Sequence, residues 1–106
     1  MEIDKVDIEI LYMLFVQNAT SPMNSFSINK IIENTDLKLS YYSFLRRINK
    51  KLVPLGYLLP GYKDGNSKTH YLSDSAIAYL KENIIEREDV FDLEEYVDEI
   101  IDSQED

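Results

Sequence analysis

A chain of 106 residues is long enough for one domain and leaves little room for a second, so any function must be built around a single small core. Apolar residues make up 44% of it and charged residues 29%, as in a folded globular domain rather than a disordered chain. Cysteine is absent and histidine occurs once, which excludes disulfides, thiolate nucleophiles and the usual zinc ligand sets. We therefore expect no metal and no cofactor.

The net charge of −9 argues against a nucleic-acid partner only if its distribution is ignored. Residues Met1–Asn29 carry a net charge of −3, Lys30–Ser73 a net charge of +5, and Asp74–Asp106 a net charge of −11. Phosphate binding responds to the potential within a Debye length, about 8 to 10 Å. A basic middle segment is therefore compatible with nucleic-acid binding by an acidic protein.

The start of the chain has no basic segment before an apolar stretch, as a secretory signal would have. Its longest apolar run, Ile10–Val16, is far too short to cross a bilayer. We expect a cytoplasmic protein without a membrane partner.

Apolar residues at steps of three and four predict an amphipathic helix over Ile3–Gln17, with acidic residues on its polar face. The polar segment Asn18–Ser25 predicts a loop, with a short strand at Asn24–Phe26. Ser27 is a candidate N-cap for a short second helix that ends near Asn34.

A third helix is expected to begin after Ser40, a second N-cap candidate, and to end before Pro54 and Gly56. The spacing places four apolar side chains inward, namely Phe44, Leu45, Ile48 and Leu52. The outward positions are polar or basic, namely Tyr42, Ser43, Arg46, Arg47, Asn49, Lys50 and Lys51. The helix therefore presents a basic face.

Two β-compatible runs, Tyr57–Tyr62 and Lys68–Leu72, flank a segment that contains an Asp-Gly turn signal, which predicts a hairpin. Ser73 then caps a fourth helix whose inward residues are Ala76, Ile77, Leu80 and Ile84.

A further amphipathic helix, or a kinked continuation of the fourth, is predicted near the C-terminus. It carries an apolar stripe of Val90, Leu93, Val97 and Ile100, while its acidic residues form the solvated side. We expect residues 1–86 to form the domain and residues 87–106 to form a dimerisation helix. The alternative is that this helix folds back on its own domain.

The order and spacing of these elements resemble the winged helix superfamily of bacterial and archaeal regulators, including the MarR-like, PadR-like and ArsR-like groups, over Ile3–Leu80. Besides the tri-helical segment, the stretches Leu52–Leu58 and His70–Ser73 carry the resemblance. It implies a mainly α fold with a small β-hairpin (α+β), a winged helix-turn-helix with an additional C-terminal helix. It also implies double-stranded DNA as the partner, read by a homodimer. The metal and small-ligand sites of some relatives do not carry over, because no Cys or His cluster is present.

The third helix offers the Arg, Lys and Asn side chains that pair with guanine and adenine in the major groove. The hairpin lysines are expected at the DNA backbone. The expected DNA-binding residues are Tyr41, Tyr42, Ser43, Arg46, Arg47, Lys50, Lys51, Lys63 and Lys68. Two alternatives remain open, that the basic face is merely solvated and that one of the two tyrosines packs on the second helix.

The sequence thus predicts a sequence-specific DNA-binding protein without enzymatic activity, either a transcriptional regulator such as a repressor or a related DNA-site adaptor that binds repeated sites. The alternative from another class is a protein-interaction module, an anti-repressor or DNA mimic that uses the acidic C-terminal helix. The sequence does not identify a small-molecule effector.

Overall fold

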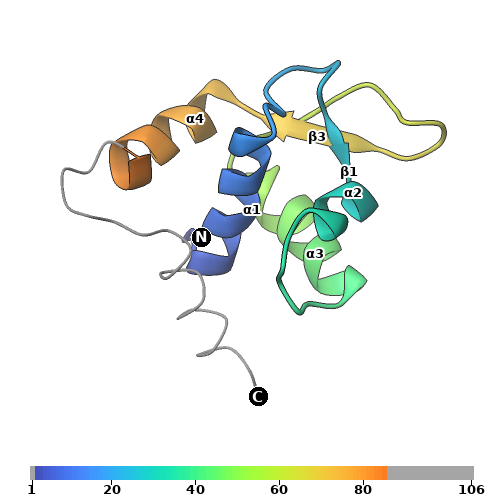
Figure 1. Ribbon diagram of the computed structural model, residues 1–106, viewed down its shortest axis with the longest axis horizontal. Coiled ribbons are helices and arrows are strands. Elements are labelled where there is room, and N and C mark those ends of the chain that lie inside the picture. The colour runs from blue at the N-terminus through green and yellow to red at the C-terminus, as the bar shows by residue number, and fades with distance from the viewer. Residues whose placement is uncertain (1, 86–106) are drawn as a thin grey trace.

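The computed structural model describes residues 2–85, in which the helices pack beside a small sheet (Figure 1). The elements in chain order are α1 (Lys5–Val16), β1 (Phe26–Ser27), α2 (Ile28–Glu33), α3 (Tyr41–Arg47), η1 (Ile48–Leu52), β2 (Leu58–Pro60), β3 (Thr69–Leu72), α4 (Asp74–Leu80) and η2 (Lys81–Ile85). The segments η1 and η2 are π-helical turns that continue α3 and α4. The expected apolar stripe of Val90, Leu93, Val97 and Ile100 lies outside the described residues, as does the expected domain boundary after residue 86.

The helix starts predicted from the sequence are confirmed where a serine caps them. The hydroxyl oxygens of Ser27, Ser40 and Ser73 accept hydrogen bonds from backbone N–H groups three residues later, at the starts of α2, α3 and α4. The first helix begins two residues later than expected. Its N-cap is Asp4, which forms a reciprocal capping box with Asp7, so a pair of carboxylates defines this end of α1.

The three strands form an antiparallel sheet in the order β1-β3-β2, with β3 in the centre. Phe26 pairs with His70 on one side of β3, and Pro60 pairs with the same residue on the other. The first strand lies at Phe26–Ser27, slightly later than the predicted Asn24–Phe26. The predicted hairpin is confirmed, and its tip extends away from the helices (Figure 1).

The core forms where α1 meets the other helices, because α1 lies between α3 and α4 (Figure 1). Side chains with 2% exposure or less come from every layer of the fold, among them Ile10, Leu14, Phe44, Ile48, Leu58 and Leu80. This mixed arrangement of helices and a three-stranded sheet is compatible with a winged helix-like fold. Across residues 2–85, no helix has the length and apolar character that crossing a membrane requires.

The base of the hairpin is tied to the loop before β1 by hydroxyl groups. Ser25 Oγ donates to Thr69 Oγ1 at 2.7 Å, and Thr69 Oγ1 donates to the carbonyl oxygen of Tyr62. Gly61 lies against this pair so closely that an added Cβ would come within 2.2 Å of Ser25 Oγ and 2.3 Å of Ser25 Cβ. The hairpin therefore leaves the sheet at a position where only glycine fits.

We expect Gly61→Ala to lower the thermal midpoint, because the overpacked base costs about 1 to 3 kcal/mol. Adding Ser25→Gly in the same chain removes the closest contacts and should restore part of the loss. Circular dichroism melting of the single and double variants measures both effects. An unchanged midpoint for Gly61→Ala would show that the hairpin base gives way easily.

Candidate nucleic-acid interface

The helical periodicity of α3 and η1 gives this segment a core face and an outer face. Phe44, Ile48 and Leu52 point into the core and have no exposed surface. The opposite side carries Tyr42, Arg46, Asn49 and Lys50, all exposed, which line a shallow groove of about 270 Å³ together with Leu45. The outer face therefore combines two cations, an amide and an aromatic ring in an accessible position.

Two of the predicted outward cations turn instead toward the start of α1. Arg47 Nη1 lies 2.7 Å from Asp4 Oδ2 and 2.9 Å from Asp7 Oδ1. Lys51 Nζ lies 2.5 Å from Asp7 Oδ2 and 3.6 Å from Asp4 Oδ2. We call these four residues the ion-pair cluster.

The cluster corrects the sequence-based orientation of three side chains. Asp7, expected on the polar face of the first helix, has a side chain with 0% exposure, and Arg47 and Lys51 have side-chain exposures of 23% and 18%. Arg47 and Lys51 lie three residues after Phe44 and Ile48, so they sit on the flank of the core face. From that flank their long side chains reach the carboxylates at the start of α1.

Hydrogen bonds within the cluster favour the charged forms of Asp4 and Arg47. Burial acts to raise the pKa of Asp4, but hydrogen bonds from Arg47 and from the backbone of Asp7 outweigh it, so the pKa falls below its ordinary value. Burial likewise acts to lower the pKa of Arg47, but its bonds to Asp4 and Asp7 raise it. The charges of Arg47 in α3 and Lys51 in η1 are thus balanced by carboxylates within the protein.

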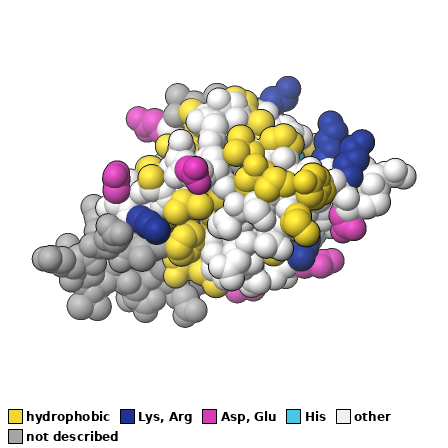
Figure 2. Space-filling view, turned by 90° about the horizontal axis from the view of Figure 1, so that it is seen from above, with side chains coloured by type: hydrophobic (Ala, Val, Ile, Leu, Met, Phe, Trp, Pro, Cys, Tyr) yellow, Lys and Arg dark blue, Asp and Glu magenta, His cyan; other side chains and the backbone are white. Residues whose placement is uncertain are grey.

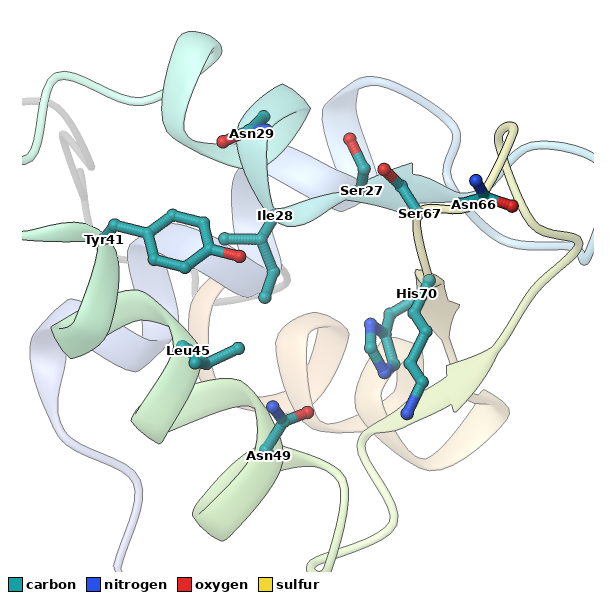
Figure 3. Close-up of a pocket in the computed structure, with 10 residues that line it drawn as sticks. Ser27, Ile28, Asn29, Tyr41, Leu45, Asn49, Asn66, Ser67 and His70 are labelled. Atoms are coloured by element: carbon teal, nitrogen blue, oxygen red, sulfur yellow. The ribbon is translucent and has the colours of Figure 1, made fainter.

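The tyrosines and the serine at the start of α3 take different positions. The rings of Tyr41 and Tyr42 meet edge to face, with their centres 5.8 Å apart. Tyr42 is 73% exposed on the outer face, whereas Tyr41 turns toward the side of Ile28 in α2 (Figure 3). Ser43 belongs to the cap of α3, since Ser40 Oγ donates to its hydroxyl and accepts from its backbone N–H.

The hairpin supplies the remaining predicted cations, Lys63 and Lys68, and both are exposed. On the face seen in Figure 2, Lys and Arg side chains gather toward the end where the hairpin lies, while acidic side chains are scattered over the face. Lys68 also lines a cavity between the hairpin and α3. The structure thus brings one hairpin lysine close to the helix.

Sequence reasoning missed two features of this region. Asn49 was counted among the base-pairing types of the third helix but left out of the expected DNA-binding residues; the structure places it in the groove of the outer face with Arg46 and Lys50, and its position three residues after Arg46 was a signal for that grouping. The cavity that Lys68 shares with His70 and Asn66 had no signal, because it depends on how the hairpin folds over the helix.

The described residues therefore form a small winged helix-like module whose third helix presents Tyr42, Arg46, Asn49 and Lys50 beside a basic hairpin. The chain is 35% identical over 81 residues to the DNA-binding protein TubR of Clostridium botulinum C phage, in an alignment that spans 76% of this chain and 96% of that protein. The chain belongs to the TubR family. No family model and no solved structure matches it, so the comparisons single out none of the MarR-like, PadR-like or ArsR-like groups.

The ion-pair cluster predicts opposite roles for two adjacent arginines. Arg47→Ala should lower the free energy of unfolding by about 1 to 3 kcal/mol, because it takes one of two cations from the buried carboxylate of Asp7. Arg46→Ala, on the exposed face of the same helix, is the matched control and should change it by less than about 0.5 kcal/mol. Urea denaturation measures both values. Equal losses would mean that the cluster contributes nothing specific.

The cluster also predicts acid sensitivity. Because folding lowers the pKa of Asp4, the stability that its carboxylate contributes is complete above its ordinary value of 3.8 and is lost as the pH falls through the lower folded value. Asp4→Asn keeps a capping side chain but cannot titrate. The thermal midpoint of the parent should exceed that of the variant at neutral pH, and the difference should shrink below about pH 4. A difference independent of pH would contradict this account.

Proposed function

We propose that this chain binds double-stranded DNA in a sequence-specific manner through the outer face of α3 and η1. The carrying observation is that Arg46, Asn49 and Lys50 stand exposed together on one helical face, while the neighbouring cations are neutralised by the ion-pair cluster. The relative in the TubR family, whose name describes it as DNA-binding, supports the same partner.

The outer face has suitable chemistry for reading base edges. Arg and Lys pair with the O6 and N7 atoms of guanine, and Asn pairs with the N6 and N7 atoms of adenine, when a helix lies in the major groove. Arg46, Asn49 and Lys50 supply these three side-chain types within two helical turns. Tyr42 would contact a thymine methyl group or a phosphate beside them.

The remaining predicted residues take supporting roles in this proposal. Lys63 and Lys68 contact the phosphate backbone from the hairpin, which strengthens binding without selecting a sequence. Tyr41 and Ser43 shape the start of the helix. Arg47 and Lys51 act chiefly by holding α3 against α1, because both are engaged with carboxylates.

In the cell, such an activity suits a transcriptional regulator or an adaptor that marks repeated DNA sites. A single small module contacts few base pairs, so we propose that two copies act together on two-fold sites. The stripe of Val90, Leu93, Val97 and Ile100 is the proposed contact between them.

A selection from random duplex DNA, carried out with the full chain, tests the proposal. Arg46→Ala should weaken binding to the selected site about tenfold to a hundredfold, because a base-reading arginine contributes about 1 to 3 kcal/mol. Lys81→Ala removes an exposed cation at the start of η2, outside α3 and the hairpin, and is the charge-matched control. If both variants bind as the parent does, or if the selection yields no preferred site, α3 is not the reader.

A further inference from the structure

A cavity of about 310 Å³ opens between α2, α3 and the hairpin (Figure 3), and none of the four residues of the ion-pair cluster lines it. This volume lies at the lower end of the range of small-molecule sites, about 300 to 1,000 Å³. Figure 3 shows Tyr41 and Leu45 at one end of it and His70 with Asn66 at the other. The cavity is thus bounded by three separate elements and is large enough for a ligand of nucleotide size.

The wall formed by β3 contains a polar side chain that the protein leaves unsatisfied. His70 is only 7% exposed, and its Nδ1 atom is buried without a hydrogen-bond partner among the described residues. An unpaired buried polar atom is costly, so it normally has a partner in the protein or in ordered water, and an atom without one calls for an explanation such as a bound water or ion. Burial, followed by the positive charge of Lys68, holds the pKa of His70 below its ordinary value, which leaves a neutral imidazole.

The other lining residues define the chemistry of the occupant. Lys68 is the one charged side chain among the described residues that line the cavity, and none of them is acidic. Hydroxyl and amide groups line the remaining polar wall, at Ser27, Ser67, Asn29, Asn49 and Asn66. Ile28, Leu45 and the ring of Tyr41 supply flat apolar surface at the opposite end (Figure 3).

We infer that this cavity binds a nucleotide unit, with its phosphate ester at Lys68 and His70 and its base against Tyr41, Ile28 and Leu45. A single cation with hydroxyl partners suits one phosphate group, and amides suit the polar edges of a base. The unit is either a free mononucleotide or one nucleotide of a DNA strand that passes between the hairpin and α3. The second source rests on the proposed DNA-binding function, and the first does not.

Nuclear magnetic resonance of the full chain tests this site with defined probes. The four 2′-deoxynucleoside 5′-monophosphates, 2′-deoxyadenosine, inorganic phosphate and a short duplex are titrated separately. At least one monophosphate should shift the His70 imidazole and Asn49 side-chain resonances at lower concentration than the nucleoside or inorganic phosphate does. Lys68→Ala should weaken that binding about tenfold or more, whereas Lys81→Ala should leave it unchanged. Both variants lie at exposed positions, so neither disturbs the core.

The titration with the duplex distinguishes a free mononucleotide from a nucleotide of a DNA strand. It also distinguishes failure of the nucleotide site from failure of the proposed DNA-binding function. If the duplex also shifts His70, and a monophosphate displaces it, the cavity holds a nucleotide of the DNA strand. If only the monophosphates shift His70, the ligand is a free nucleotide, and this inference survives even when no duplex binds. If the duplex shifts Arg46 and Lys50 while no probe shifts His70, the inference is overturned and the DNA-binding function stands. Equal binding of inorganic phosphate and the monophosphates also overturns it.

Discussion

The buried carboxylate of Asp7 is the constraint on which the placement of the third helix depends. A buried charge is costly unless cations reach it, and Asp7, with no exposed side-chain surface, meets two of them from α3 and η1. The same carboxylate also caps the start of α1 by accepting from the backbone N–H of Asp4. One side chain thus links the beginning of the first helix to the flank of the third and fixes the rotation of the third helix about its own axis.

This rotation decides which cations remain accessible. Arg46 and Arg47 are neighbours in sequence, yet one lies on the exposed outer face and the other in the ion-pair cluster. The hydrogen bond from Val53 N to Ile48 O closes the π-helical turn η1, and Lys50 and Lys51 lie within that turn. Such turns occur often at functional sites. The basic stretch of sequence is thereby divided into an exposed face on one side and an ion-paired contact with α1 on the other.

Local signals in the sequence were sufficient to predict the order of the elements, the three serine caps and the hairpin, because capping and turn chemistry act over a few residues. They did not reveal that Asp7 is buried or that Arg47 and Lys51 are engaged, since those contacts join residues about 40 positions apart. The cavity beside His70 was equally invisible. Helical spacing alone sorts side chains into inward and outward sets. A long Arg or Lys side chain on the flank of the core face can be exposed to solvent or turned toward the protein, and the presence of a carboxylate within reach determines which.

For an acidic chain to bind DNA, its carboxylates must be kept away from the surface that contacts the phosphates. Asp4 and Asp7 pair with Arg47 and Lys51 within the protein, and neither the groove of the outer face nor the cavity beside His70 has an acidic residue among the described residues that line it. Carboxylates that lie farther away than a Debye length, about 8 to 10 Å, are screened from a charge at these positions. They still repel the rest of a long duplex, which weakens binding that depends on charge alone. Under the proposed function, affinity must then come from contacts that read bases or hold individual nucleotides, and an acidic composition favours specific over non-specific binding.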